Sequence, residues 1–185
     1  MHSLADSSFE KYRGYLRMLV DVLTDPRLRG KLDPSGIVQQ TLFEAYQASA
    51  NLESSSDGSV LPWLRRILAN NLADEMKRLL RAKRGGGREI SLEQAMEQSS
   101  LKLEALIAAD DLSPSHRLMK QERILHLTDA LTRLPDAQRE ALILQHWHGW
   151  QLAKIAEQMG RSRVAVAGLV KRAIQSLRED LASFD

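Results

Sequence analysis

The chain has 185 residues, of which 43% are hydrophobic, and this length suits one large or two small domains with cores of their own. It has no cysteine, which excludes disulfides and thiolate metal sites, and no apolar run of about 18 residues that could cross a membrane. Its 26 Lys and Arg against 24 Asp and Glu give a formal net charge of only +2. Because the first residues also lack the apolar run of a signal peptide, we expect a cytoplasmic protein with no membrane segment.

The charges are distributed unevenly along the chain. Residues 61–90 hold eight basic and three acidic side chains, whereas residues 91–115 hold one basic and five acidic side chains. The stretch from Arg161 to Arg178 holds five basic residues and no acidic one. Two basic regions on either side of an acidic segment indicate two contacts with one polyanion.

The first half of the chain has the periodicity of helices and no alternating, strand-like stretch. We expect a first helix over residues 9–23 and a second over residues 34–48, with Asp33 as its N-cap and Pro34 at its first position. A third helix, over residues 61–81, carries the first basic region.

Turn-forming and irregular segments separate these helices and divide the chain. Residues 51–59 are rich in Ser and predict a loop. Three consecutive glycines open the segment 85–115, which has no sustained period and predicts a flexible linker with one short helix. The expected fold is therefore all-α, with two small helical domains over residues 1–84 and 116–185.

The second domain ends in the pattern of a helix-turn-helix. Apolar residues over 152–159 lie on one face of a two-turn helix, Gly160 suits its C-terminus, and Ser162 can cap the next helix. A helix-turn-helix places its second helix in the major groove of DNA. The expected buried face of that second helix is Val166, Val170, Ala173, Ile174 and Leu177.

The opposite side of the second helix is basic but also carries the small residues Ala165, Ala167 and Gly168. A solvated basic helix is the alternative, although such a helix would favour Glu and Lys at these positions because their helix propensity is higher. Small side chains allow a helix backbone to approach a partner closely. We therefore expect this side to face DNA.

Four stretches, in this order, resemble regions 2 and 4 of the extracytoplasmic-function group of bacterial sigma factors, in the sigma-70 family. They are IVQQTLFEAY, WLRRILANNLADEMKR, LTRLPDAQREALIL and LAKIAEQMGRSRVAVAGLVKRA. Members of that family bind core RNA polymerase and direct it to promoters, so the resemblance implies a sigma factor without enzymatic activity. The chain departs from the family at Gly36, where Asp is usual, and in VAVAGLV, where many relatives carry polar residues; we interpret the second departure as altered DNA contact.

The resemblance also assigns roles to individual residues. The clamp helices of the largest polymerase subunit would be bound by Gln39, Gln40, Phe43 and Glu44. The −10 element would be contacted by Asn70, Asn71, Asp74, Arg78 and Arg81. The −35 element would be contacted by Arg161, Ser162, Arg163, Gly168, Lys171 and Arg172. The loop over residues 51–59 would receive a flipped base, and we assign Trp63 to the core rather than to a wedge at the melted junction.

The expected partners are core RNA polymerase and promoter DNA, and the resemblance admits an anti-sigma factor as a third. We expect no cofactor, no metal and no catalytic site, since His146 and His148 lack carboxylate or cysteine partners and RGGGR follows no strand. Two alternatives stay open. One is a helix-turn-helix transcriptional regulator that acts without core polymerase, which would need a ligand pocket or a dimer face in the first half. The other is a helical adaptor that binds no DNA, which leaves the two basic regions unexplained.

Overall fold

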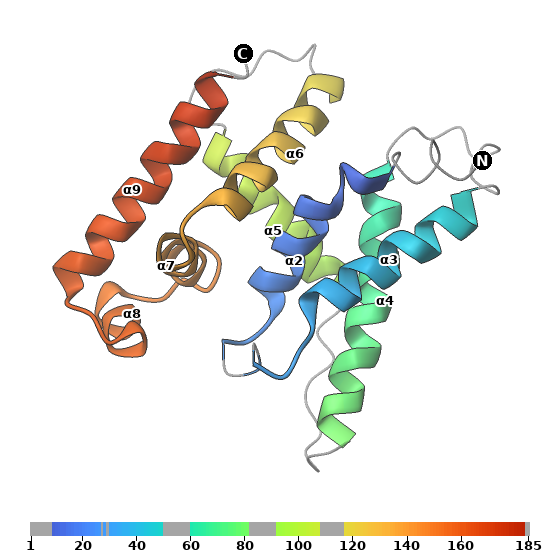
Figure 1. The fold of residues 1–185 in the computed structure, drawn as a ribbon, viewed down its shortest axis with the longest axis horizontal. Coiled ribbons are helices and arrows are strands. Elements are labelled where there is room, and N and C mark those ends of the chain that lie inside the picture. The colour runs from blue at the N-terminus through green and yellow to red at the C-terminus, as the bar shows by residue number, and fades with distance from the viewer. Residues whose placement is uncertain are drawn as a thin grey trace. The chain divides into compact units, whose positions relative to one another are not determined.

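All regular elements in the described part of the chain are α-helices, as expected (Figure 1). The computed structural model describes residues 9–26, 28, 30–49, 60–81, 92–107 and 117–183. The chain forms two compact units, Met1–Ser100 and Leu101–Asp185. No helix in the described segments is both long and apolar enough to cross a bilayer.

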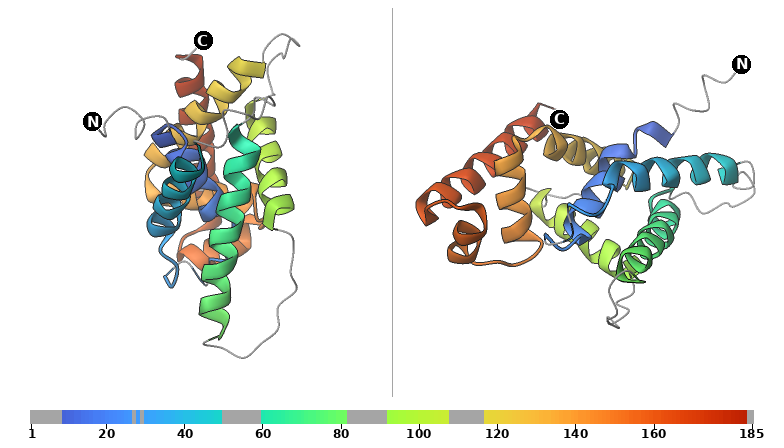
Figure 2. Two further views of the ribbon diagram at one scale, coloured as in Figure 1. Left: turned by 90° about the vertical axis from the view of Figure 1, so that its right-hand side faces the viewer. Right: turned by 60° about the horizontal axis from the view of Figure 1, so that its bottom comes forward.

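The first unit is built on three helices, α2 (Arg13–Leu23), α3 (Pro34–Ser49) and α4 (Val60–Arg81), which pack against one another in pairs (Figures 1 and 2). These helices lie where the sequence predicts the first three. Their core contains the fully buried side chains Tyr15, Leu16, Leu19, Leu64, Leu68 and Leu72.

The start of α3 is fixed by the predicted cap. The Oδ1 atom of Asp33 accepts a hydrogen bond from the backbone N–H of Gly36 at 3.0 Å, which satisfies a donor in the first helical turn. A Cβ atom on Gly36 would lie only 2.6 Å from the other carboxylate oxygen of Asp33. The glycine that departs from the family pattern is therefore compatible with a capped helix and leaves room for the capping side chain.

Helix α5 (Leu92–Ile107) lies within the expected linker and, with 16 residues, is longer than the short helix expected there. The side chain of Met96 is fully buried. Within the first unit, the hydroxyls of Tyr15 and Ser100 are 2.7 Å apart, and Arg65 donates to the Tyr15 hydroxyl at 3.0 Å. The Tyr15–Ser100 contact attaches α5 to α2, and Arg65 of α4 binds the same tyrosine hydroxyl. Residues 85–91 and 108–115 of the expected linker lie outside the described residues.

The second unit contains α6 (Arg117–Arg133), α7 (Asp136–His146), α8 (Leu152–Met159) and α9 (Arg163–Ala182). Helix α9 packs against the other three. Leu134 and Pro135 separate α6 from α7. Lys102, in the part of α5 that belongs to this unit, donates to the carbonyl of Trp147 at 3.0 Å. This hydrogen bond satisfies a carbonyl at the C-terminal cap of α7.

Candidate nucleic-acid interface

The turn between α8 and α9 has the geometry of a helix-turn-helix. Gly160 ends α8 in the left-handed conformation, with φ 62° and ψ 37°, and the N–H of Arg161 donates to the carbonyl of Ala156 at 2.9 Å. The Oγ atom of Ser162 then accepts from the N–H of Ala165 at 3.1 Å. Because the helix stop and the next N-cap are separated by one residue, the two helices are held in a tight, defined turn. Both predicted roles, Gly160 as stop and Ser162 as cap, are confirmed.

The buried face of α9 is close to the expected one. The buried side chains are Val166, Leu169, Val170, Ala173 and Leu177. Ile174, expected in the core, is only half-buried, whereas Leu169, which the sequence reading omitted, is buried. The helix therefore presents a continuous exposed side away from α7 and α8.

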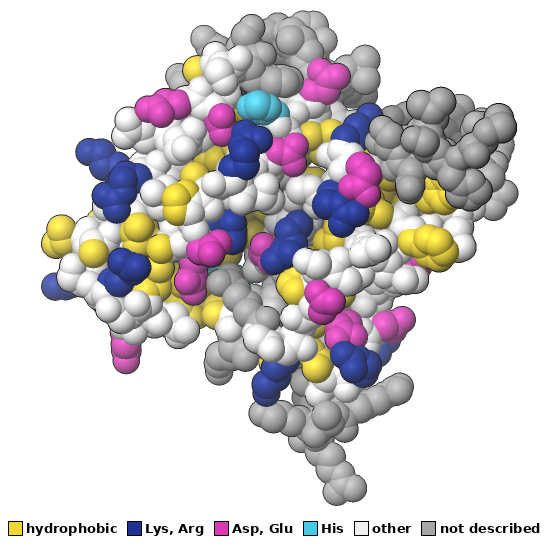
Figure 3. Space-filling view, in the orientation of Figure 1, with side chains coloured by type: hydrophobic (Ala, Val, Ile, Leu, Met, Phe, Trp, Pro, Cys, Tyr) yellow, Lys and Arg dark blue, Asp and Glu magenta, His cyan; other side chains and the backbone are white. Residues whose placement is uncertain are grey.

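Basic side chains lie along that exposed side. All five basic residues between Arg161 and Arg178 are exposed, and none of them makes an ion pair with a residue in the described part of the chain. In Figure 3, Lys and Arg side chains appear among hydrophobic ones over α8 and α9, at the left of the view. Their charge is therefore available to an external anion such as a phosphate backbone.

The small residue Gly168 is covered by a side chain of its own helix. A Cβ atom at this position would lie 3.3 Å from Nη1 of Arg172, four residues later. The Arg172 guanidinium thus lies back along the helix, over the glycine. The absence of a side chain at Gly168 gives the Arg172 guanidinium room, and it also keeps a bulky side chain off this part of the helix surface.

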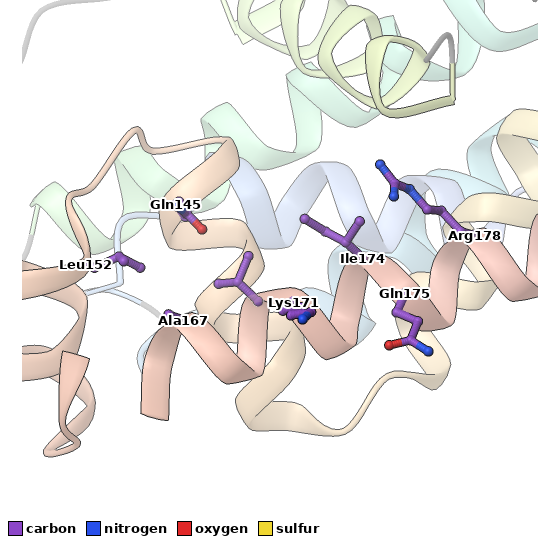
Figure 4. A pocket seen from close by; sticks show the side chains of 8 residues that line it. Gln145, Leu152, Ala167, Lys171, Ile174, Gln175 and Arg178 are labelled. Atoms are coloured by element: carbon purple, nitrogen blue, oxygen red, sulfur yellow. The ribbon is translucent and has the colours of Figure 1, made fainter. Parts of the chain in front are cut away.

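An open groove runs beside the basic side of α9, between α9, the end of α7 and the start of α8 (Figure 4). Its floor is apolar, with Leu152 and Ile174 facing into it, and Lys171 and Arg178 lie at its rim. Lys171 belongs both to this groove and to the residues expected at the −35 element. None of the described residues that line the groove is acidic.

The residues expected at the −10 element are spread along α4, and several are engaged within the unit. Asn70 is exposed, whereas Nδ2 of Asn71 donates to Thr41 at 3.2 Å and to Glu44 at 3.3 Å, which joins α4 to α3. Arg78 donates to Glu75 at 2.8 Å, and Asp74 lies 3.9 Å from Nζ of Lys77.

The Arg78 hydrogen bond lowers the pKa of Glu75, so the pair stays ionised and the positive charge of Arg78 is partly compensated. This distinguishes α4 from α9, whose basic side chains have no such partner among the described residues. The backbone of Arg81 ends α4, but its side chain lies outside the described residues, as does the predicted base pocket over residues 51–59. Trp63 is half-buried with its ring centroid 5.9 Å from that of Phe9, at the edge of the core.

The residues expected to bind polymerase share one side of α3. Gln39, Gln40 and Phe43 are exposed, with 55% of Phe43 accessible to solvent. Gln40 donates to Oε1 of Glu44 at 2.7 Å, which holds the carboxylate on the same side. Tyr46, one turn beyond Phe43, is 40% exposed and extends this aromatic surface. Tyr46 is not among the residues predicted from the sequence, although its i+3 spacing from Phe43 indicates that both side chains lie on one face of α3.

Comparison with known proteins identifies the family of this chain. Residues 124–177, which span the helix-turn-helix, match the family model described as Sigma-70, region 4. The chain is 32% identical over 161 residues to the ECF RNA polymerase sigma factor SigG of Mycobacterium tuberculosis, covering 82% of this chain and 43% of SigG. The chain belongs to the sigma-70 family. Its similarity to SigG supports its assignment to the extracytoplasmic-function (ECF) group of that family.

Two further relatives are also named as RNA polymerase sigma factors. The probable RNA polymerase sigma factor RfaY of Xanthomonas campestris is 30% identical over 146 residues, covering 78% of this chain and 33% of RfaY. CarQ of Myxococcus xanthus, an RNA polymerase sigma factor, is 27% identical over 149 residues, covering 80% of this chain and 75% of CarQ. The chain thus spans less than half the length of SigG and of RfaY.

Among solved structures, the chain is similar to the sigma factor RpoE of Bartonella quintana, crystallised in complex with the anti-sigma factor NepR. The two share 21% sequence identity over 95% of each chain, with a TM-score of 0.34.

Proposed function

We propose that this ECF sigma-70 family member is an RNA polymerase sigma factor that binds core polymerase and directs it to promoters. The observation that carries the proposal is the capped helix-turn-helix whose exposed side holds five basic residues without ion pairs in the described part of the chain. Such a helix is suited to the major groove, with its charges placed for phosphates. Binding of two promoter elements, −35 and −10, would account for the two basic regions of the chain.

We assign the two promoter elements to the two domains. Region 4, over residues 116–185, would bind the −35 element through Arg161, Ser162, Arg163, Gly168, Lys171 and Arg172. Region 2, over residues 1–84, would bind the −10 element and help to melt it through Asn70, Asn71, Asp74, Arg78 and Arg81. Residues 85–115 would connect the domains, with α5 packed on region 2 through its first part.

We assign core polymerase to the exposed side of α3. Exposed aromatic side chains are unusual on a helix that faces only water, and Phe43 and Tyr46 are among the large hydrophobic residues that remain exposed in the described residues. Aromatic residues are enriched in protein interfaces. The clamp helices of the largest polymerase subunit are the proposed partner, and binding there would place the protein in the cytoplasm. An anti-sigma factor is a further proposed partner on the family resemblance.

The polymerase contact is tested with a double substitution, Gln39→Ala with Phe43→Ala. We expect it to weaken the complex with purified core polymerase at least tenfold, by size-exclusion chromatography and titration, because truncating interface anchors costs more than about 1 kcal/mol each. The free energy of unfolding should stay within about 0.5 kcal/mol of the unmodified chain, because both side chains are exposed.

The matched control is Leu42→Ala, at a buried position of the same helix. It should lower the free energy of unfolding by about 2–5 kcal/mol through the cavity that it leaves. A double variant that binds polymerase normally would remove this face from the interface. If the unmodified chain binds DNA but forms no complex with core polymerase, the alternative function, a helix-turn-helix regulator, is correct instead.

A further inference from the structure

Val164 is an exposed hydrophobic residue in the first turn of α9. It is 83% accessible to solvent, more than Phe43, Tyr46 or Leu101, the other large hydrophobic residues that stay exposed in the described part of the chain. An aliphatic side chain gains nothing from this position in the isolated protein, because its apolar surface stays in water. Its β-branched side chain also lowers helix propensity relative to Ala.

Helical spacing places Val164 among the basic side chains. Gly168, Lys171 and Arg172 follow it at i+4, i+7 and i+8, so the four residues share one stripe of α9. The buried face of the helix, which includes Val166 and Val170, lies on another side. A phosphate backbone that is bound by Lys171 and Arg172 would therefore bring the bases of the groove towards Val164.

The neighbours of Val164 have little capacity to read bases by hydrogen bonds. Among the exposed residues in the first two turns of α9, only Arg163 has a hydrogen-bonding side chain, because the others, apart from Val164, are Ala165 and Ala167. The Oγ atom of Ser162, just before the helix, accepts the capping bond from Ala165. The first two turns can thus read base edges in two ways, through the Arg163 guanidinium or through apolar contact.

In the major groove, the apolar group that distinguishes one base from another is the C5-methyl group of thymine. We propose that Val164 is a specificity-determining residue that contacts a thymine methyl group in the −35 element. This inference rests on the proposed function and adds to it the kind of base that the start of α9 selects. Burial of one methyl group against Val164 would stabilise the complex, and cytosine, which lacks that group, would be disfavoured there.

The test replaces each thymine of the −35 element, one at a time, by deoxyuridine, which removes only the methyl group. Polymerase holoenzyme reconstituted with the full chain is titrated on each promoter duplex and its affinity is measured by fluorescence anisotropy. We expect one deoxyuridine duplex to bind about fourfold more weakly than the thymine duplex, as for the loss of one buried methyl group.

Two variants assign that loss to Val164. Val164→Ala should bind the thymine and deoxyuridine duplexes with nearly equal affinity, whereas Val164→Ile, which keeps a β-branched apolar side chain, should keep the preference for thymine. Thermal unfolding of both variants should match that of the unmodified chain, since the side chain is exposed.

The inference is overturned if no deoxyuridine substitution weakens binding, or if Val164→Ala keeps the full preference for thymine. Failure of the proposed function gives a different result, namely no binding to any promoter duplex beyond that of core polymerase alone. That result would overturn both the proposed function and the role of Val164.

Discussion

At the scale of single residues, Gly168 and Arg172 have to be considered together. From the sequence, the small residues of α9 indicate close approach of the helix to DNA. In the structure, the space above Gly168 holds the Arg172 guanidinium, with Nη1 3.3 Å from where a Cβ atom would be. Gly168 therefore has a positioning effect on the arginine, which sequence patterns cannot show because they do not give the conformation of a long side chain.

A double-mutant cycle between these two positions separates the two roles of Gly168. In the chain with Arg172, Gly168→Leu should weaken promoter binding of the holoenzyme about as much as Arg172→Ala does, because the leucine side chain occupies the space of the guanidinium. In the Arg172→Ala background it should add little further loss. Helix propensity should improve by about 0.8–1 kcal/mol in both backgrounds, so unfolding of the helix is not the expected cause. Gly168→Ala, which requires a smaller shift, is the control and should have a weaker effect. Equal losses from Gly168→Leu in both backgrounds would contradict the positioning role and support direct contact of this surface with DNA.

Residues with a local, backbone-directed role were predictable. Asp33 as a cap, Gly160 as a helix stop and Ser162 as the second cap are all present, with hydrogen bonds of 3.0 Å and 3.1 Å for the two caps. Each role depends on residues within four positions in the sequence, so the pattern contains the information. The hydrogen bonds of Asn71 to Thr41 and Glu44, on another helix, depend on tertiary packing and were not predictable.

At the scale of elements, α5 shows why a helix can be overlooked in a sequence. Its buried side chains Met96, Ser99, Ser100 and Leu103 follow helical spacing, but the middle two are polar. Serine in a core position interrupts the apolar period, and the segment therefore resembles a linker. The structure satisfies Ser100 through Tyr15 and the carbonyl of Met96, so the polar residue is compatible with burial.

The packing of α5 predicts a difference between two positions on the same helix. Met96→Ala should lower the free energy of unfolding by about 2–5 kcal/mol, because Met96 is fully buried. Leu101→Ala, at a position that is 57% exposed, should change it by less than about 0.5 kcal/mol. Urea unfolding followed by circular dichroism measures both values. Equal, small effects would show that α5 is not part of a packed core in solution and that the linker interpretation holds for the whole segment.

At the scale of the whole molecule, the distribution of charge matters more than its sum. The net charge of +2 gives no indication of a nucleic-acid partner, whereas the stretch from Arg161 to Arg178 holds five basic residues and no acidic one. In the second unit that charge is available, because these basic residues form no ion pair within the described part of the chain. On α4, acidic residues one turn earlier compensate part of the charge, as in the pair of Arg78 with Glu75. Electrostatic attraction to DNA should therefore come mainly from the second unit, although both basic regions indicate contact with a polyanion in the sequence.

The most direct test of the central claim is transcription in vitro from fragmented bacterial genomic DNA, by core polymerase with and without this chain, with all transcript 5′ ends sequenced. A sigma factor should produce a set of start sites that is absent with core polymerase alone, and these sites should share one −35 and one −10 element at a fixed spacing. The −35 element found in this way also supplies the duplexes needed for the Val164 experiment. An identical pattern of start sites with and without the chain would contradict the account.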